Sequence, residues 1–241
     1  MKEMRKFGRS SRLRSALEGS KVLAAFTLIE LLVVILIIGI LAALLIPVAG
    51  AVKRHQDISQ AQAEMGQLET AIADYKNDRG YYPPGSDPTG LTNQLYYELA
   101  ATVLTNNGPT SVFQTLDASA FIKTVDVPNA FNRLPGFANS NRGGDTKSWT
   151  ARDYLPQLKP NQLGTFQSGG VWITNLVTAV GGPDGLYRPL GVDGVNPWRY
   201  LYPGTNNPTG YDLWVQLRIG GNKYLVCNWT RNVELNNTRY P

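Results

Sequence analysis

The sequence predicts an α+β fold in which one long N-terminal α-helix packs on a small C-terminal antiparallel β-sheet. Three observations lead to this prediction. An apolar run covers residues 26–46, and helical periodicity continues beyond it to about residue 79. Short runs rich in β-branched and aromatic residues return late in the chain. A long helix with one apolar stripe needs a second layer to cover that stripe.

A basic leader precedes the apolar run. Residues 1–25 contain seven Lys or Arg and two Glu, and the rest of the chain has 16 residues of each sign. A basic segment before an apolar run keeps its own end of the chain in the cytoplasm. The neutral remainder lacks the basic surface that nucleic-acid binding requires, so we expect no nucleic-acid partner.

Residues 26–46 are predicted to form a transmembrane helix, with Glu30 as their only charge. A helix of this length spans roughly 31 Å, which is enough for a bilayer core. Gly39 and Pro47 interrupt the apolar pattern. We expect Pro47 to kink the helix rather than end it, because helical periodicity resumes after it.

Residues 47–79 are predicted to form an amphipathic continuation of the same helix. The apolar residues of its stripe are three or four positions apart: Ile58, Ala61, Met65, Leu68, Ile72 and Tyr75. Lys53, Gln60, Glu64 and Asp74 are predicted on other faces. Gly80 is the expected cap residue, and residues 80–241 are expected to form a globular domain.

Within the globular domain, turn residues indicate a loop over 83–90, and leucine spacing indicates a short helix over 91–104. Residues 105–170 are expected to be loops and short helices. Four strands are predicted, at 171–180, 198–203, 211–219 and 223–230. The "GGN" between the last two predicts a hairpin turn.

Few residues suit catalysis. Cys227 is the only cysteine, so it cannot form an internal disulfide and is expected in a C-terminal strand. His55, the only histidine, lies in the polar run "KRHQD" and is expected on a solvated face. No acid–base or metal constellation stands out, so an enzyme is not predicted. Most of the tryptophans, Trp149, Trp172, Trp198, Trp214 and Trp229, are expected in the core rather than at a sugar site.

The stretch "FTLIELLVVILIIGILAALLIP", residues 26–47, resembles the N-terminus of the type IV pilin superfamily, which includes the pseudopilins of type II secretion. "YKNDRGYYP" and "NPWRYLYPG" with "YDLW" resemble the major pseudopilin. The resemblance implies cleavage between Ala25 and Phe26 by a prepilin peptidase, although the family usually has Gly at the position of Ala25. It also implies N-methylation of Phe26 and helix-loosening roles for Gly39 and Pro47.

The resemblance further implies a structural subunit rather than an enzyme. The expected partners are the prepilin peptidase, other pilin or pseudopilin subunits, and an inner-membrane assembly platform. The expected location is the bacterial inner membrane, with one pass, a cytoplasmic N-terminus and a periplasmic C-terminal domain, followed by a filament.

Glu30 has two interpretations. Thr27 and Glu30 fit the capping box S/T-x-x-E, which stabilises a helix start. Alternatively, cleavage would free the α-amine of Phe26, and Glu30 would pair with that amine or with a neighbouring subunit's amine during assembly. We favour the second interpretation, with Thr27 and Glu30 as assembly residues.

The family resemblance also suggests a calcium-binding site, since acidic residues follow "YDL" in the major pseudopilin. Here Asp212 is present, but "WVQLRIGGNK" follows it without an acid. Asp184 and Asp193 lie in the turn sequences "PDG" and "VDG". We therefore expect no metal cofactor, and Asp184, Asp193 and Asp212 are only weak candidates for calcium ligands.

Two alternatives remain open. A conventional signal peptide could be cut after Ala51, in the small-residue pattern Ala49-x-Ala51, which would release a soluble secreted domain beginning at Val52. The chain could also be a type IV pilin for adhesion or DNA uptake, built in the same way as a pseudopilin.

Overall fold

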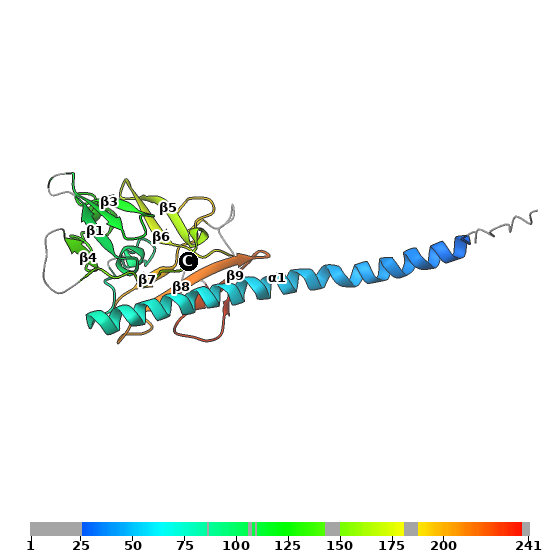
Figure 1. Ribbon diagram of the computed structural model, residues 1–241. Helices are drawn as coiled ribbons and strands as arrows, with labels where there is room; N and C mark the ends of the chain where they lie inside the picture. The colour runs from blue at the N-terminus through cyan, green and yellow to red at the C-terminus, as the bar shows by residue number, and fades with distance from the viewer. Residues whose placement is uncertain are drawn as a thin grey trace, which may run out of the picture. The chain divides into compact units, whose positions relative to one another are not determined.

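The computed structural model describes residues 26–85, 87–105, 108, 110–142, 150–180 and 188–237. Within the helix at residues 45–49, only the backbone is described. The chain divides into two compact units, residues 1–47 and 48–241. The helix α1, Leu28–Arg79, begins in the first unit and ends in the second (Figure 1). It continues through Gly39 and Pro47, so Pro47 does not end it, as predicted, and the kink expected at Pro47 stays a prediction.

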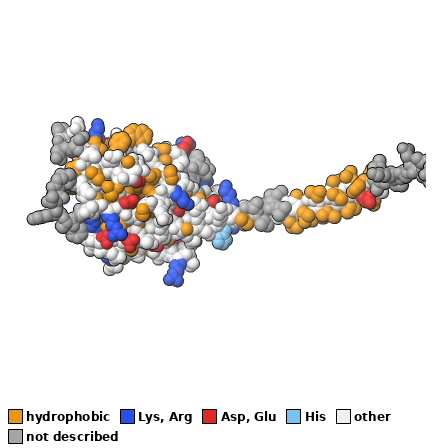
Figure 2. All heavy atoms as spheres, in the orientation of Figure 1, with side chains coloured by type: hydrophobic (Ala, Val, Ile, Leu, Met, Phe, Trp, Pro, Cys, Tyr) orange, Lys and Arg blue, Asp and Glu red, His pale blue; other side chains and the backbone are white. Residues whose placement is uncertain are grey.

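In the first unit, the apolar side chains of α1 have no cover. Every large apolar side chain described between Phe26 and Leu44 is exposed, from 44% at Val33 to 81% at Leu28 (Figure 2). Within the part of the chain that the structure describes, no helix combines the length and the apolar character needed to cross a membrane. This finding does not support the predicted span 26–46, whose last two side chains lie outside the described residues. The span stays a prediction.

In the second unit, the predicted apolar stripe of α1 is confirmed. Ala61, Leu68, Ile72 and Tyr75 are at most 2% exposed and belong to the main core. Gly80 ends the helix, with a φ of +83° and a 2.7 Å hydrogen bond from its amide to the carbonyl of Lys76. This is the left-handed cap that glycine adopts without strain.

The C-terminal sheet is antiparallel, in the order β10-β9-β8-β7, and residues of β7, β8 and β9 share the main core with α1. Gly220 and Gly221, with φ of +59° and +83°, form the predicted hairpin turn between its two long strands. The strands are β7 (Arg199–Leu201), β8 (Asp212–Ile219), β9 (Asn222–Cys227) and β10 (Glu234–Leu235).

The prediction of loops and short helices over residues 105–170 is correct only in part, because it missed the strands of this region. A second sheet has the order β3-β2-β1-β4, in which β1 and β4 are parallel, and β5 pairs with β6 in a separate hairpin. The strands are β1 (Thr102–Thr105), β2 (Val112–Thr115), β3 (Phe121–Lys123), β4 (Ser140–Arg142), β5 (Leu163–Ser168) and β6 (Val171–Leu176).

The helices of this region are short. The helix predicted over 91–104 is confined to α2, Leu95–Leu99, because the chain turns into β1 directly afterwards. A single helical turn, α3, covers Val127–Ala130, and a 3₁₀ turn, η1, covers Pro160–Gln162. The predicted class, a long helix packed on C-terminal antiparallel β-structure, is confirmed, with two further sheets added to the expected one.

The tryptophans follow the prediction in part. Trp198 and Trp214 are buried, and Trp229 is half-buried with its ring centroid 5.7 Å from that of Trp214. Trp172 is 63% exposed on β6, and Trp149 lies outside the described residues. His55 is exposed, as expected, with Nδ1 3.4 Å from the hydroxyl of Ser59.

Candidate functional site

The first turn of α1 contains the predicted capping box. The amide and the hydroxyl of Thr27 donate hydrogen bonds to Oε2 of Glu30, at 2.8 and 2.7 Å. In return, the amide of Glu30 donates to the hydroxyl of Thr27 at 3.3 Å. These bonds satisfy donors that a helix start leaves without a partner. The capping interpretation of Glu30 is therefore confirmed as a structural role.

The capping box leaves part of the carboxylate available. Both bonds from Thr27 end on Oε2, and no donor among the described residues reaches Oε1 of Glu30. Phe26, 76% exposed, directly precedes this turn. The carboxylate can therefore accept a further hydrogen bond or ion pair while the cap stays intact. Ala25 lies outside the described residues, so the predicted cleavage position is not tested.

Gly39 has no steric requirement within this chain. A Cβ added there would meet no atom within 4 Å. Glycine inside a helix costs roughly 0.5–1 kcal/mol relative to alanine. The structure thus offers no internal reason for this glycine, and the helix-loosening role of Gly39 and Pro47 stays a prediction.

Among the described residues, Asp193 and Asp212 belong to no cluster of acidic, histidine or cysteine side chains that could hold a metal ion. The carboxylate of Asp212 is 1% exposed and accepts the backbone amides of Thr205, Asn206 and Asn207 at 2.8 to 2.9 Å. Asp193 forms an exposed ion pair of 2.7 Å with Arg188. Asp184 lies outside the described residues. Because a calcium ion needs converging oxygen atoms, and Asp212 is instead surrounded by N–H donors, the surroundings of Asp212 do not fit calcium.

Comparison with curated proteins found short matches of moderate identity. Type II secretion system core protein G of Escherichia coli is 43% identical to this chain over 58 residues, which are 24% of this chain and 40% of that protein. The core protein G of Aeromonas hydrophila is 42% identical over 60 residues, 25% of this chain and 42% of that protein. Fimbrial protein EcpC of Eikenella corrodens is 37% identical over 71 residues, 30% of this chain and 46% of that protein.

The predicted resemblance to the type IV pilin superfamily is confirmed. The chain spans less than half the length of the curated relatives it matches. No family model matches the chain. No solved structure matches it either.

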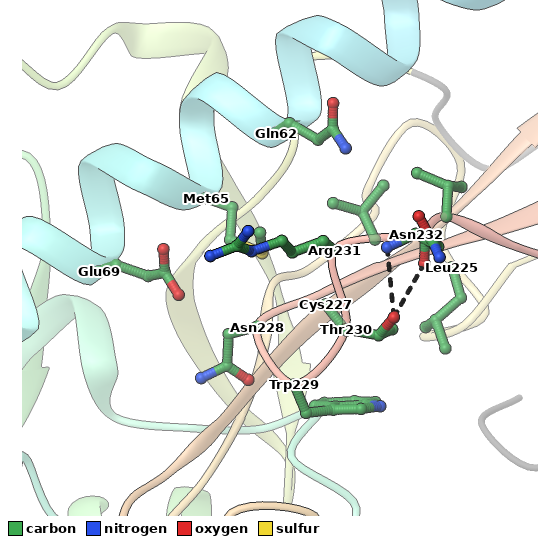
Figure 3. Close-up of a pocket in the computed structure, with 12 residues that line it drawn as sticks. Gln62, Met65, Glu69, Leu225, Cys227, Asn228, Trp229, Thr230, Arg231 and Asn232 are labelled. Atoms are coloured by element: carbon green, nitrogen blue, oxygen red, sulfur yellow. Dashed lines mark hydrogen bonds between the residues drawn. The ribbon is translucent and has the colours of Figure 1, made fainter.

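A cavity of about 440 Å³ lies in this pilin-like chain between α1 and residues 225–233. Figure 3 shows Arg231 extending toward α1, near Met65 and Glu69. Burial raises the pKa of Glu69, and it also raises the pKa of the Cys227 thiol to about 11. A thiol with that pKa is protonated at neutral pH and is a poor nucleophile. The cavity groups therefore do not form an activated nucleophile.

Besides Asp212, two further buried carboxylates of the pilin-like chain were not anticipated. Glu98 is fully buried, although it was predicted simply as part of a short helix. Glu64 was predicted on a polar face, which is wrong: it is buried and accepts the hydroxyl of Thr178 at 3.0 Å and the amide of Ala179 at 3.2 Å. The spacing could have predicted the burial of Glu64. This residue lies three positions after Ala61 and four before Leu68, so it shares their face of the helix.

Proposed function

We propose that the chain is a structural subunit of a type II secretion pseudopilus or a related type IV pilus-like filament. The supporting observation is the exposed apolar surface of α1 from Phe26 to Leu44. A monomeric soluble protein rarely exposes an apolar patch of this extent, so the surface requires an apolar partner. The relatives, a type II secretion core protein and a fimbrial protein, indicate the class of assembly.

The proposed subunit has two successive environments. Before assembly, residues 26–46 sit in the bacterial inner membrane, with the basic leader in the cytoplasm and the globular domain in the periplasm. After assembly, the same apolar side chains pack against those of neighbouring subunits in the filament. In both environments the apolar surface of α1 is removed from water, which is the main driving force for its burial.

Processing precedes assembly in this proposal. A prepilin peptidase cuts between Ala25 and Phe26 and Phe26 is N-methylated, while an inner-membrane assembly platform and other subunits are the later partners. The new α-amine has a pKa near 8, so it is mostly cationic at neutral pH. It would lie one turn from Glu30, whose Oε1 has no donor among the described residues.

The N-terminus of the mature protein tests this proposal. The full-length chain is expressed with a prepilin peptidase, and the product is analysed by N-terminal sequencing and intact mass. We expect the mature chain to begin at Phe26. Ala25→Leu should leave the precursor uncut because the bulkier side chain does not fit a pocket for small residues, whereas Ala25→Gly should be processed.

A mature chain beginning at Val52 would replace the proposal with the signal-peptide alternative. That cut would fall after Ala51, in the middle of the continuous helix α1. It would remove the capped start of the helix and all of its exposed apolar surface. The structure therefore gives the secreted domain no evident use for residues 26–51.

A type IV pilin for adhesion or DNA uptake is the second candidate, and the match to the fimbrial protein EcpC favours it. Exposed Trp172 on β6 could contact an external surface, whereas the neutral remainder of the chain does not favour DNA. Antibody labelling of intact cells separates the two. Filaments outside the outer membrane at native expression would indicate a pilin, and their absence together with a secretion defect in a deletion strain would indicate a pseudopilin.

A further inference from the structure

The family resemblance suggests a calcium site in the segment after "YDL", but in this chain "WVQLRIGGNK" follows Asp212 without an acidic residue. We infer that the carboxylate of Asp212 organises the loop 204–211 without a metal ion, and that the globular domain does not need calcium. This inference concerns the folding of residues 48–241 and holds whether or not the chain assembles into a filament.

The loop closes around Asp212 at the start of β8. Oδ2 accepts the amides of Thr205 and Asn206, both at 2.8 Å, and the side-chain amide of Asn206 at 3.0 Å. Oδ1 accepts the amide of Asn207 at 2.9 Å. Three successive backbone N–H groups thus point at one carboxylate, which makes a concave site for an anion. The loop supplies the anion site, and Asp212 is the anion.

The loop is further tied to the end of β9. The side-chain amide of Asn228 donates to the carbonyl of Tyr211 at 3.0 Å, and its oxygen accepts the amide of Leu213, also at 3.0 Å. The side-chain amide of Asn207 donates to the same Tyr211 carbonyl at 3.1 Å. Asn228 therefore ties the C-terminal end of the loop and the start of β8 to the end of β9 without a cation.

The chemistry around Asp212 opposes a cation. A calcium ion takes six to eight oxygen ligands, usually including several carboxylates. Here donor hydrogens, with partial positive charge, surround both oxygens of Asp212. The packing leaves little space as well, because a Cβ at Gly204 would lie 2.6 Å from Oδ1 of Asp212 and 2.8 Å from the carbonyl oxygen of Asn207.

Between Asp212 and Cys227 the chain has no loop beyond a two-residue turn in which oxygen atoms could converge. β8 and β9 pair continuously from Trp214 opposite Cys227 to Ile219 opposite Asn222. Only Gly220 and Gly221 connect them. A paired hairpin uses its backbone carbonyls in the strand ladder, so they are not available as a set of metal ligands.

Thermal unfolding of the full-length chain in detergent tests the inference. We expect the same Tm in EDTA and in millimolar calcium chloride, because a ligand that binds only the native state would raise the Tm. Asp212→Asn should lower the Tm by about 5–10 °C, since an amide NH₂ group would face N–H donors. Added calcium should not restore it. Asp193→Asn, which removes an exposed carboxylate, is the control and should change the Tm by less than about 2 °C.

A Tm that falls in EDTA, or rises with calcium, in the unmodified chain would overturn the inference. This arm needs no variant, so it stays decisive even if Asp212→Asn fails to fold. An Asp212→Asn chain with the Tm of the unmodified chain would also overturn it, because the carboxylate would then not organise the loop.

Discussion

The hydroxyl of Tyr75 on α1 donates a 3.0 Å hydrogen bond to the buried carboxylate of Glu98 on α2. The same carboxylate accepts the backbone amides of Ala138 and Asn139, at 2.8 and 2.9 Å. One acid therefore connects the long helix, the short helix and the segment that leads into β4. Glu98 has no exposed surface, so these donors take the place of water.

We predict that Tyr75→Phe destabilises the globular domain by about 1–3 kcal/mol, the cost of leaving a buried acceptor without its donor. The phenyl ring keeps the packing of Tyr75 in the core, so the loss of stability measures the contribution of the hydroxyl. Chemical denaturation of the full-length chain in detergent would measure it. Tyr81→Phe is the matched control, because Tyr81 is exposed, and its loss should stay within about 0.5 kcal/mol. Equal losses in the two variants would contradict the assigned role of the Tyr75 hydroxyl.

Glu98 should also make stability depend on pH. Burial raises the pKa of Glu98, and the hydrogen bonds from Ala138, Asn139 and Tyr75 offset this only in part. A raised folded-state pKa means that the native state holds a proton more tightly than the unfolded chain. The stabilising contribution is therefore complete below the unfolded pKa of about 4.5 and is lost as the pH rises through the folded pKa.

The free energy of unfolding of the unmodified chain, minus that of Glu98→Gln, should accordingly fall as the pH rises from about 4.5 toward neutrality. Because the other titratable groups are common to both chains, the difference isolates Glu98. Denaturation curves at several pH values would measure it. A difference that grows with pH over this window would show that the native state favours the ionised acid, against the prediction.

Asp87 should behave in the opposite way. Burial alone would raise its pKa, but hydrogen bonds from the amides and hydroxyls of Thr89 and Thr92, at 2.6 to 2.9 Å, outweigh burial and lower it. A lowered folded pKa gives stability that is present above the unfolded value near 3.8 and is lost as the pH falls through the folded pKa. We expect Asp87→Asn to cost about 1–3 kcal/mol at pH 7 and progressively less below pH 4. A cost that does not vary with pH would exclude an ionised Asp87 as its source.

The sequence predicted the elements whose pattern is local. The period of α1, the glycine cap at Gly80 and the Gly220–Gly221 turn depend on residues within a few positions of one another, and all three are confirmed. The strands β1 to β4 have three or four residues each and show no sustained alternation. Their identity comes from pairing partners distant in sequence, such as Thr102 with Ser140, which no local pattern encodes.

The sequence also did not predict which acidic side chains are buried. Asp212 was considered only as a weak calcium candidate, yet it is buried and accepts hydrogen bonds from residues 205–207. Glu98 is satisfied by Tyr75 and residues 138–139, which lie 23 to 41 positions away. Burial of an acid depends on such donors, and only the folded chain brings them together.

At the start of α1, the geometry of Glu30 is compatible with both of its interpretations, as a helix cap and as an assembly residue. The capping box with Thr27 uses Oε2 and leaves Oε1 available. A cap needs a hydrogen-bond acceptor, whereas an ion pair with the α-amine of a processed subunit needs a negative charge. A substitution that keeps the acceptor and removes the charge therefore separates the two roles.

We predict that Glu30→Gln blocks filament assembly and leaves processing and the globular domain intact. Glutamine keeps an acceptor for Thr27, so the helix start survives, but the amine of Phe26 loses its counter-ion when subunits enter the apolar filament interior. Thr27→Ala is the matched comparison, because it removes the capping hydroxyl and keeps the carboxylate, and it should reduce assembly less than Glu30→Gln does. Sheared filaments are quantified by immunoblot, with N-terminal sequencing to verify cleavage at Phe26. Filaments at the unmodified level in Glu30→Gln, together with a loss in Thr27→Ala, would mean that Glu30 acts as a helix cap and that its charge has no part in assembly.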